Sequence, residues 1–316
     1  MGAGSEDQDK YWDWLFGSFY GKSPSLDTST FGATVSDCFV LLDVADAVEA
    51  TKHISEVVDL ALMRQDSVLW ESIAREPSVW AELGRRIKSP TIFKEAVCHV
   101  VGQWTMLKNG TIEALPPDIR KLCQRKWDEL ELAKRAIEIR IGGHYPPFLC
   151  RDYAEKPHRT AYATDIYMWM CLSFFRQYLM QSGTDRKNRL ADDGGYRWYK
   201  QINEGGAAYL DHEAMRTFHQ FFPMSSKACG VMEAHMNVLK DEVKIFVKDL
   251  MIVRTHLDPG NMSGIEKPWL TCALITDEDL PWHVSTASDQ RMVDDTLIEN
   301  EGKDEGEMLD FEDEDE

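Results

Sequence analysis

The sequence lacks the signatures that would point to a known catalytic or metal chemistry. Its 316 residues contain no Walker A, GxSxG or GxGxxG motif and no CxxC pair. The seven cysteines are scattered along the chain. An odd, unpaired set of thiols within apolar segments predicts reduced, buried cysteines in an intracellular protein, cytoplasmic or nuclear.

Long apolar runs and an excess of basic charge are missing as well. The longest strongly apolar run, residues 166–175, is about half of the ~20 residues that a membrane span needs. Basic residues of 120–140 alternate with Asp and Glu, which indicates a solvated helix face rather than a phosphate track. The formal net charge is −19, and a field of that sign repels phosphate. We therefore expect neither a membrane nor a nucleic acid as a direct partner.

The acidic residues are concentrated at the C-terminal end. Residues 276–316 contain 17 Asp and Glu against Arg291 and Lys303, so this segment carries −15 of the formal −19. With few apolar residues and little opposite charge, it is predicted to be disordered. Two roles are open for this acidic tail: keeping the protein soluble, which is the simpler one, or contacting a basic protein surface.

Helical periodicity is what the sequence does contain. Ser89 as a cap, Pro90 at the first helical position and apolar residues every three to four positions predict a helix over 90–104. Further helices are expected at 118–141, 166–180, 210–222 and 226–252. Residues 166–180 are apolar nearly all round, which predicts a central position. The expected fold is mainly α: a multi-helical bundle of two helical subdomains with little or no β-structure.

Four aromatic residues near the start form the candidate interaction surface. Trp12, Phe16, Phe19 and Tyr20 fall on one side of a helix at spacings of three and four, which is typical of a core face. Without a covering layer from the same chain, they offer an exposed aromatic surface to another chain. Both outcomes stay open at this point.

Three stretches, residues 11–63, 69–145 and 162–282, resemble a group of fungal BTB/POZ-domain proteins. Phe19-Tyr20-Gly21, followed by Leu41-Leu42 and Ala45-Asp46, is similar to the closing helices of a BTB/POZ domain. Residues 69–145 resemble the helical region that follows that domain, and more loosely the BACK domain of cullin adaptors. The motifs that carry the second and third stretches are Trp80-Ala81-Glu82-Leu83, Gly143-His144-Tyr145-Pro146, Asp165-Ile166, Trp169, Asp193-Gly194-Gly195 and Pro281-Trp282.

The resemblance implies a division of the chain and a function. It makes 11–53 a remnant of the C-terminal part of a BTB/POZ-like domain and 54–145 a BACK-like region. A second helical subdomain over 146–275 and the acidic tail over 276–316 complete the division. The first half of the BTB/POZ domain is expected to be missing, because nothing before Tyr11 can supply its strands. The implied function is a non-enzymatic scaffold or adaptor whose partners are other proteins, with self-association as an option.

The alternative is an enzyme of unknown class with a carboxylate–histidine site in the second subdomain. The runs Asp192-Asp193-Gly194-Gly195-Tyr196 and Glu204-Gly205-Gly206 are the most enzyme-like patches, although Asp-Gly and Gly-Gly also form turns. His212-Glu213 does not complete an HExxH motif, because Arg216 stands where the second His is required. The enzyme hypothesis predicts that Asp193, His212 and His219 converge on one pocket. No catalytic residue, cofactor or metal is assigned.

Overall fold

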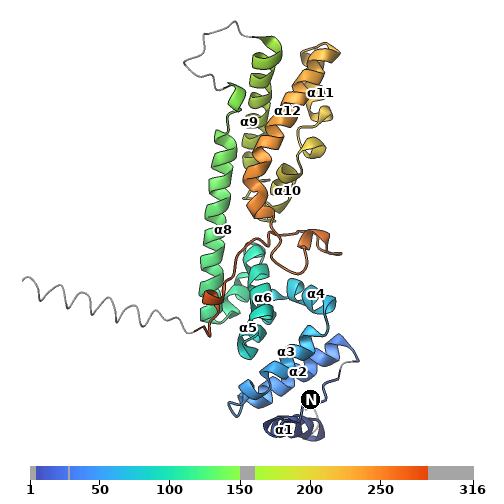
Figure 1. The fold of residues 1–316 in the computed structure, drawn as a ribbon, viewed down its shortest axis with the longest axis vertical. Helices are drawn as coiled ribbons and strands as arrows, with labels where there is room; N and C mark the ends of the chain where they lie inside the picture. The colour runs from blue at the N-terminus through green and yellow to red at the C-terminus, as the bar shows by residue number, and fades with distance from the viewer. Residues whose placement is uncertain (1–4, 28, 150–160, 284–316) are drawn as a thin grey trace, which may run out of the picture. The chain divides into compact units, whose positions relative to one another are not determined.

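The helical periodicity of the sequence is realised as an almost entirely helical fold (Figure 1). The computed structural model describes residues 5–27, 29–149 and 161–283. The chain is 70% helical and its described residues contain no strand, which confirms the expected mainly α class. The helices are α1 (Ser5–Phe19), α2 (Phe31–Asp46), α3 (Ser55–Met63), α4 (Ser67–Arg75), α5 (Pro77–Ile87), α6 (Pro90–Gly102), α7 (Asn109–Ala114), α8 (Pro117–Gly143), α9 (Tyr167–Thr184), α10 (Tyr196–Glu204), α11 (His212–Phe221) and α12 (Ser226–Val247).

Several helices begin where a side chain caps the first turn. Ser89 Oγ accepts a hydrogen bond from the Ile92 backbone N at 3.3 Å, and Pro90 opens α6. Ser225 and Asp211 cap α12 and α11 in the same way, with N–O distances of 3.2 Å and 2.9 Å. A cap of this kind contributes about 1 kcal/mol to stability. Local side-chain chemistry therefore fixes where these three helices begin.

Among the helices of the second half of the chain, α9 lies beside α12 (Figure 1). Met168 and Cys171 of α9 are buried against Met215 of α11 and against Met232 and Met236 of α12. The thiol of Cys171 also donates to the Met232 carbonyl at 3.2 Å. Methionine side chains adapt to irregular gaps between helices. This cluster therefore joins three helices on the inner side of α9.

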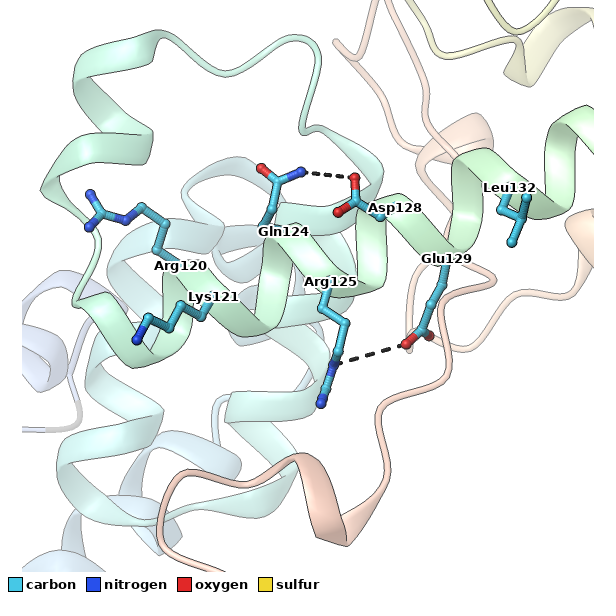
Figure 2. Close-up of a pocket in the computed structure, with 7 residues that line it drawn as sticks. All are labelled: Arg120, Lys121, Gln124, Arg125, Asp128, Glu129 and Leu132. Atoms are coloured by element: carbon cyan, nitrogen blue, oxygen red, sulfur yellow. Dashed lines mark hydrogen bonds and ion pairs between the residues drawn. The ribbon is translucent and has the colours of Figure 1, made fainter.

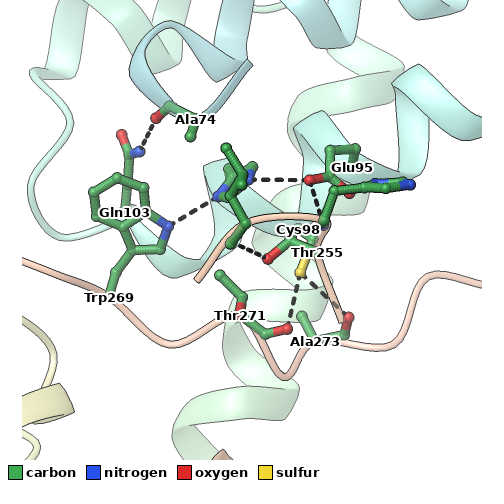
Figure 3. Close-up of polar contacts among 11 residues, drawn as sticks. Ala74, Glu95, Cys98, Gln103, Thr255, Trp269, Thr271 and Ala273 are labelled. Carbon is green, nitrogen blue, oxygen red and sulfur yellow. Dashed lines mark hydrogen bonds and ion pairs between the residues drawn. The ribbon is translucent and has the colours of Figure 1, made fainter. Parts of the chain in front are cut away.

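Residues 252–275, called the strap from here on, contain one 3-10 helix at Pro259–Asn261 and are otherwise irregular, with no strand. The Arg254 backbone N donates to the Thr271 carbonyl at 3.1 Å, and its side-chain Nε donates to the Cys272 carbonyl at 3.0 Å. The two limbs of the strap therefore lie side by side. Figure 3 shows Cys98 of α6 reaching the carbonyls of Thr271 and Ala273.

The strap covers a buried carboxylate that bonds two histidines. Glu95 of α6 is 4% exposed. His256 of the strap approaches it twice, with its backbone N 2.9 Å from Oε1 and its ring Nδ1 3.0 Å from Oε2. His99 Nε2 lies 3.5 Å from Oε1, and His99 Nδ1 accepts from the Trp269 indole N at 3.1 Å. Because the indole donates to Nδ1, the His99 proton points from Nε2 toward Glu95.

These contacts set the protonation of Glu95 and anchor the strap. Burial alone would raise the pKa of Glu95, but hydrogen bonds from His99 and His256 outweigh it and hold that pKa below its ordinary value. The His256 ring also stacks on Trp70 of α4, with ring centres 3.8 Å apart and planes 3° from parallel. A single carboxylate thus ties the strap to α6, and the stacking ties it to α4.

The buried cysteines are free thiols held in apolar surroundings. Burial raises the pKa of Cys38, Cys123 and Cys171 to about 12. A thiol with so high a pKa stays protonated at neutral pH and is a poor nucleophile. These three residues therefore act as small core side chains.

Residues 276–316 form a second unit, distinct from residues 1–275. Of this unit the structure describes 276–283, where Thr276 and Asp279 form a reciprocal capping box. The disorder predicted for the acidic tail concerns residues that lie mostly outside the described ones. Across the described part of the chain, no helix combines the length and hydropathy that crossing a membrane demands.

Candidate functional site

A hollow of about 630 Å³ lies along the outer face of α8, and Figure 2 shows the side chains around it. All seven lining residues come from this one helix: Arg120, Lys121, Gln124, Arg125, Asp128, Glu129 and Leu132. Gln124 donates to Asp128 at 3.0 Å, and Arg125 lies 3.9 Å from Glu129. Arg125, Asp128 and Glu129 of the hollow therefore meet partners on the same helix, as expected for a solvated face.

A second groove, of about 430 Å³, has the composition of a binding surface. Its floor is a stripe on and just before α9, and Phe218 of α11 forms its wall. The residues that line it are Ile166, Trp169, Met170, Ser173, Phe174, Gln177 and Phe218. Its volume falls within the roughly 300–1,000 Å³ of ligand pockets, which are lined mostly by apolar and aromatic side chains. We name it the α9–α11 groove.

Aromatic contacts build the wall and extend the apolar surface beyond it. Phe218 packs edge-on against Phe174 with ring centres 4.7 Å apart, and it stacks on Phe222 at 5.0 Å. Trp169 is 46% exposed, and Phe222 is 62% exposed. Phe221, the residue before Phe222, is 76% exposed. Large apolar surface that a chain leaves in water marks a site of interaction more often than chance.

The groove exists because α9 has two apolar faces, and the described residues bury only one of them. Met168, Cys171, Leu172 and Phe175 form its buried side. The opposite side carries the groove, where Trp169 and Ser173 are exposed in the described part of the chain. The prediction that this helix is central was therefore wrong. The apolar residues on one side of α9 belong to the core, and those on the other side form the surface of the groove.

The aromatic residues predicted as an interaction surface lie on α1 and, for Tyr20, on the turn directly after it. Phe16 is 52% exposed, Phe19 44% and Tyr20 85%, while Trp12 is half-buried. Leu15 is the fully buried residue of this helix, and α1 packs on α2. The side of α1 that packs on the chain is therefore that of Leu15, and Phe16 and Phe19 face solvent. An interaction role for these aromatic residues stays a prediction.

The residues of the enzyme hypothesis are held by different partners. Asp193 is buried and accepts from the backbone N of Gly195 at 2.9 Å, which is a turn contact. His212 pairs with Glu233 of α12, and His219 Nδ1 lies 3.8 Å from the Cys229 sulfur. Among the described residues, no group of three His, Cys, Asp or Glu side chains is placed to hold a metal ion.

Sequence reasoning missed the α9–α11 groove, although part of its signal was visible. Ile166, Trp169, Met170, Ser173, Phe174 and Gln177 recur at the three- and four-residue spacing of one helix face. Arg176 is the single charged residue between 167 and 184. What the sequence did not show was that this face stays uncovered, or that Phe218 stands beside it.

Many of the apolar residues that carried the BTB/POZ resemblance turn out to be core positions. Leu41, Leu42 and Ala45 are fully buried in α2, and Trp80 and Leu83 are buried in α5. Any all-helical protein needs apolar residues at such spacings to fill its core. Their pattern therefore reports helix packing and does not specify a family.

The comparisons with known proteins overturn that resemblance. Comparison of the chain with curated proteins and with solved structures gives no match. A family model does match, over about a third of the chain, and it belongs to a different family. The BTB/POZ assignment is therefore wrong. The division of the chain at 11–53, 54–145, 146–275 and 276–316 stays a prediction. Residues 146–249, which include α9 to α12 and the α9–α11 groove, match the fungal FF domain, a domain that mediates protein–protein interactions.

Proposed function

We propose that the chain is a non-enzymatic protein-interaction module, and that the α9–α11 groove is its docking site. The observation that carries this proposal is an open apolar groove, walled by Phe174 and Phe218, within the segment similar to an FF domain. The fold supports such a role, because α9 presents the groove on a helix fixed from behind by its methionine cluster. A rigid support of this kind lowers the ordering cost of binding.

The chemistry of the groove favours a protein partner over a charged small molecule. Arg176 is the single charge on α9 and does not line the groove, whose lining groups are all apolar, aromatic or neutral. One cation cannot neutralise a polyphosphate or a nucleic-acid backbone, which needs several. Apolar side chains of another protein, in contrast, gain about 25 cal/mol for each Å² removed from water. The groove therefore suits the apolar anchors of a protein surface.

The same lines of support weigh against catalysis. The acid and histidine residues of the enzyme hypothesis are engaged in turns and helix–helix contacts, and Asp192 pairs with Lys267 at 2.8 Å. We also propose an intracellular location, which the free buried thiols support. Cell fractionation that places the native protein outside the cell would contradict the location.

A charge placed in the groove is expected to abolish partner binding. Trp169→Glu puts a carboxylate on its floor and should weaken partner binding about tenfold or more, as loss of an aromatic anchor does. The measurement is affinity purification of the tagged full chain, with the retained proteins quantified by mass spectrometry. Ile245→Glu is the matched control, because Ile245 is an exposed apolar residue of α12, 61% exposed, outside the groove. Equal retention by Trp169→Glu and wild type would refute the docking role.

A further inference from the structure

The exposed side of α1 is a continuous row of aromatic rings. Trp12 stacks on Phe16 with ring centres 5.8 Å apart, and Phe16 meets Phe19 at 6.2 Å. The three residues stand at i, i+4 and i+7 of the helix. We call this row the α1 ridge. Phe19 also packs edge-on against His53 with ring centres 5.0 Å apart, and Phe16 and Phe19 remain exposed, so the ridge is organised and still open to a partner.

The ridge has the form of a helix that docks into a groove. Helix-in-groove recognition uses apolar anchors at i, i+3 or i+4, and i+7 of one helical face. Rigid aromatic anchors carry most of the binding energy in such contacts. The back of α1 is already fixed, because Leu15 is buried and the Tyr11 hydroxyl donates to Asp37 of α2 at 2.7 Å. The α1 ridge is therefore presented in a fixed orientation.

The α1 ridge and the α9–α11 groove also match in charge. Asp9 and Asp13 are exposed and share the side of Phe16 at helical spacing, so the ridge has an acidic edge. Lys10, the one basic residue of α1, lies 3.4 Å from Asp37 and does not neutralise that edge. Beside the groove, Arg176 follows Trp169 by seven residues, shares its side of α9 at helical spacing and is exposed. An acidic edge on the convex surface and one basic residue at the border of the concave surface are complementary.

We propose that the α1 ridge of one copy of this chain docks into the α9–α11 groove of a second copy. The inference rests on the docking role proposed for the groove and adds the identity of an occupant. Docking within one copy is not available, because α1 is held on α2, and Figure 1 shows α1 and α9 at opposite ends of the unit formed by residues 1–275.

The pairing is heterologous, with different surfaces on the two copies. A ridge facing a second ridge would oppose two convex rows and bring Asp9 and Asp13 near their own counterparts, which is unfavourable. A groove facing a groove would leave both unfilled. A heterologous contact leaves one free ridge and one free groove after each association step. Assembly should therefore proceed head to tail with rising concentration, until a ring closes or a chain of copies grows.

Sedimentation velocity of the full chain, from about 1 to 300 µM, tests the proposal. The wild type is expected to gain mass with concentration. Phe16→Glu removes the ridge and Trp169→Glu removes the groove, and each variant alone should stay monomeric over this range. Ser173→Glu is a second groove variant at an exposed position. It replaces Trp169→Glu if circular dichroism shows that Trp169→Glu does not fold. Ile245→Glu should associate like the wild type.

Mixing the variants separates this model from every symmetric alternative. Trp169→Glu keeps its ridge and Phe16→Glu keeps its groove, so an equimolar mixture should give a one-to-one dimer that grows no further. A ridge-to-ridge contact would leave the mixture monomeric and would overturn the proposal. Arg176→Glu should weaken association several-fold at low salt, because it places like charges at the acidic edge.

The outcomes also separate this inference from the proposed function. A wild-type chain that stays monomeric up to the highest concentration overturns self-docking. If Trp169→Glu still loses other retained proteins in affinity purification, the docking role of the groove stands without it. If Trp169→Glu loses neither self-association nor retained proteins, both proposals fall.

Discussion

Replacing Glu95 by alanine is expected to lower the free energy of unfolding by about 3–5 kcal/mol, the range for breaking a buried, hydrogen-bonded charge pair. The loss combines three effects. The backbone N of His256 loses its acceptor, the buried His99 is left without its carboxylate, and a cavity opens beneath the strap. Since native stabilities are typically 5–15 kcal/mol, a change of this size threatens the fold.

Urea unfolding followed by circular dichroism at pH 7 measures this change. Glu71→Ala is the matched control, since Glu71 is an exposed glutamate of the neighbouring helix α4 and should change stability by less than about 0.5 kcal/mol. His256→Ala should cost less than Glu95→Ala, because the backbone N of residue 256 still donates to Glu95. A stability for Glu95→Ala within error of Glu71→Ala would show that the strap does not depend on the carboxylate.

Low pH should lower the free energy of unfolding of the wild type through protonation of Glu95. The pKa of Glu95 in the folded chain lies below its ordinary value of 4.5, so the folded state favours the carboxylate. A lowered pKa contributes stability that is present above pH 4.5 and is lost as the pH falls through the folded pKa. The stability gap between wild type and Glu95→Gln should therefore be full at pH 6 and narrow below pH 4.5. A gap that stays constant down to pH 3 would contradict the assignment.

Much of the fold was predictable because the signals that specify a helix lie within the helix and its caps. The cap at Ser89, Pro90 after it and the apolar stripe gave 90–104, and the structure has α6 at Pro90–Gly102. The helix expected at 118–141 is α8, Pro117–Gly143. These signals act within one or two turns of chain, so a single sequence contains them in full.

The strap and its anchor were not predictable, because they depend on residues far apart in the sequence. Glu95 and His256 are separated by 161 positions, and His99 and Trp269 by 170. An irregular strap has no periodicity, and its polar contacts replace the ladder bonds of a strand. Nothing in the sequence around Cys98 and His99 indicated that these two buried side chains of α6 contact the strap.

The two candidate surfaces also differ in how far the sequence could predict them. The α1 ridge came from spacing alone, since Trp12, Phe16 and Phe19 lie on one helix. The α9–α11 groove needs Phe218 beside Phe174, a contact across 44 positions that no local pattern encodes. Whether an apolar face is core or surface depends on what covers it. The sequence therefore identified the aromatic residues of α1 but assigned the open face of α9 to the core.

Gly102 marks the closest approach between α6 and the strap. A Cβ built on this residue would lie 2.3 Å from the Leu270 carbonyl O and 2.5 Å from Trp269 Cδ1. Both atoms are constrained, because the carbonyl belongs to the backbone and the indole of Trp269 donates to the buried His99. Real carbon contacts are near 3.5–4.0 Å, so the strap would have to move away from α6. Such a movement would stretch the contacts of the strap with Cys98 and Glu95 as well.

Gly102→Ala is therefore expected to lower the free energy of unfolding by about 2–3 kcal/mol, the upper part of the range for overpacking a well-filled interior. Gly230→Ala is the matched control, because Gly230 is an exposed α12 residue whose added Cβ would meet nothing within 4 Å. There the same substitution should raise stability by about 0.4–1 kcal/mol, since alanine lowers the entropy of the unfolded chain. Urea unfolding of both variants gives the comparison, and opposite signs are required. If Gly102→Ala were as stable as the wild type, the strap would not pack against α6 at the distance that the structure shows.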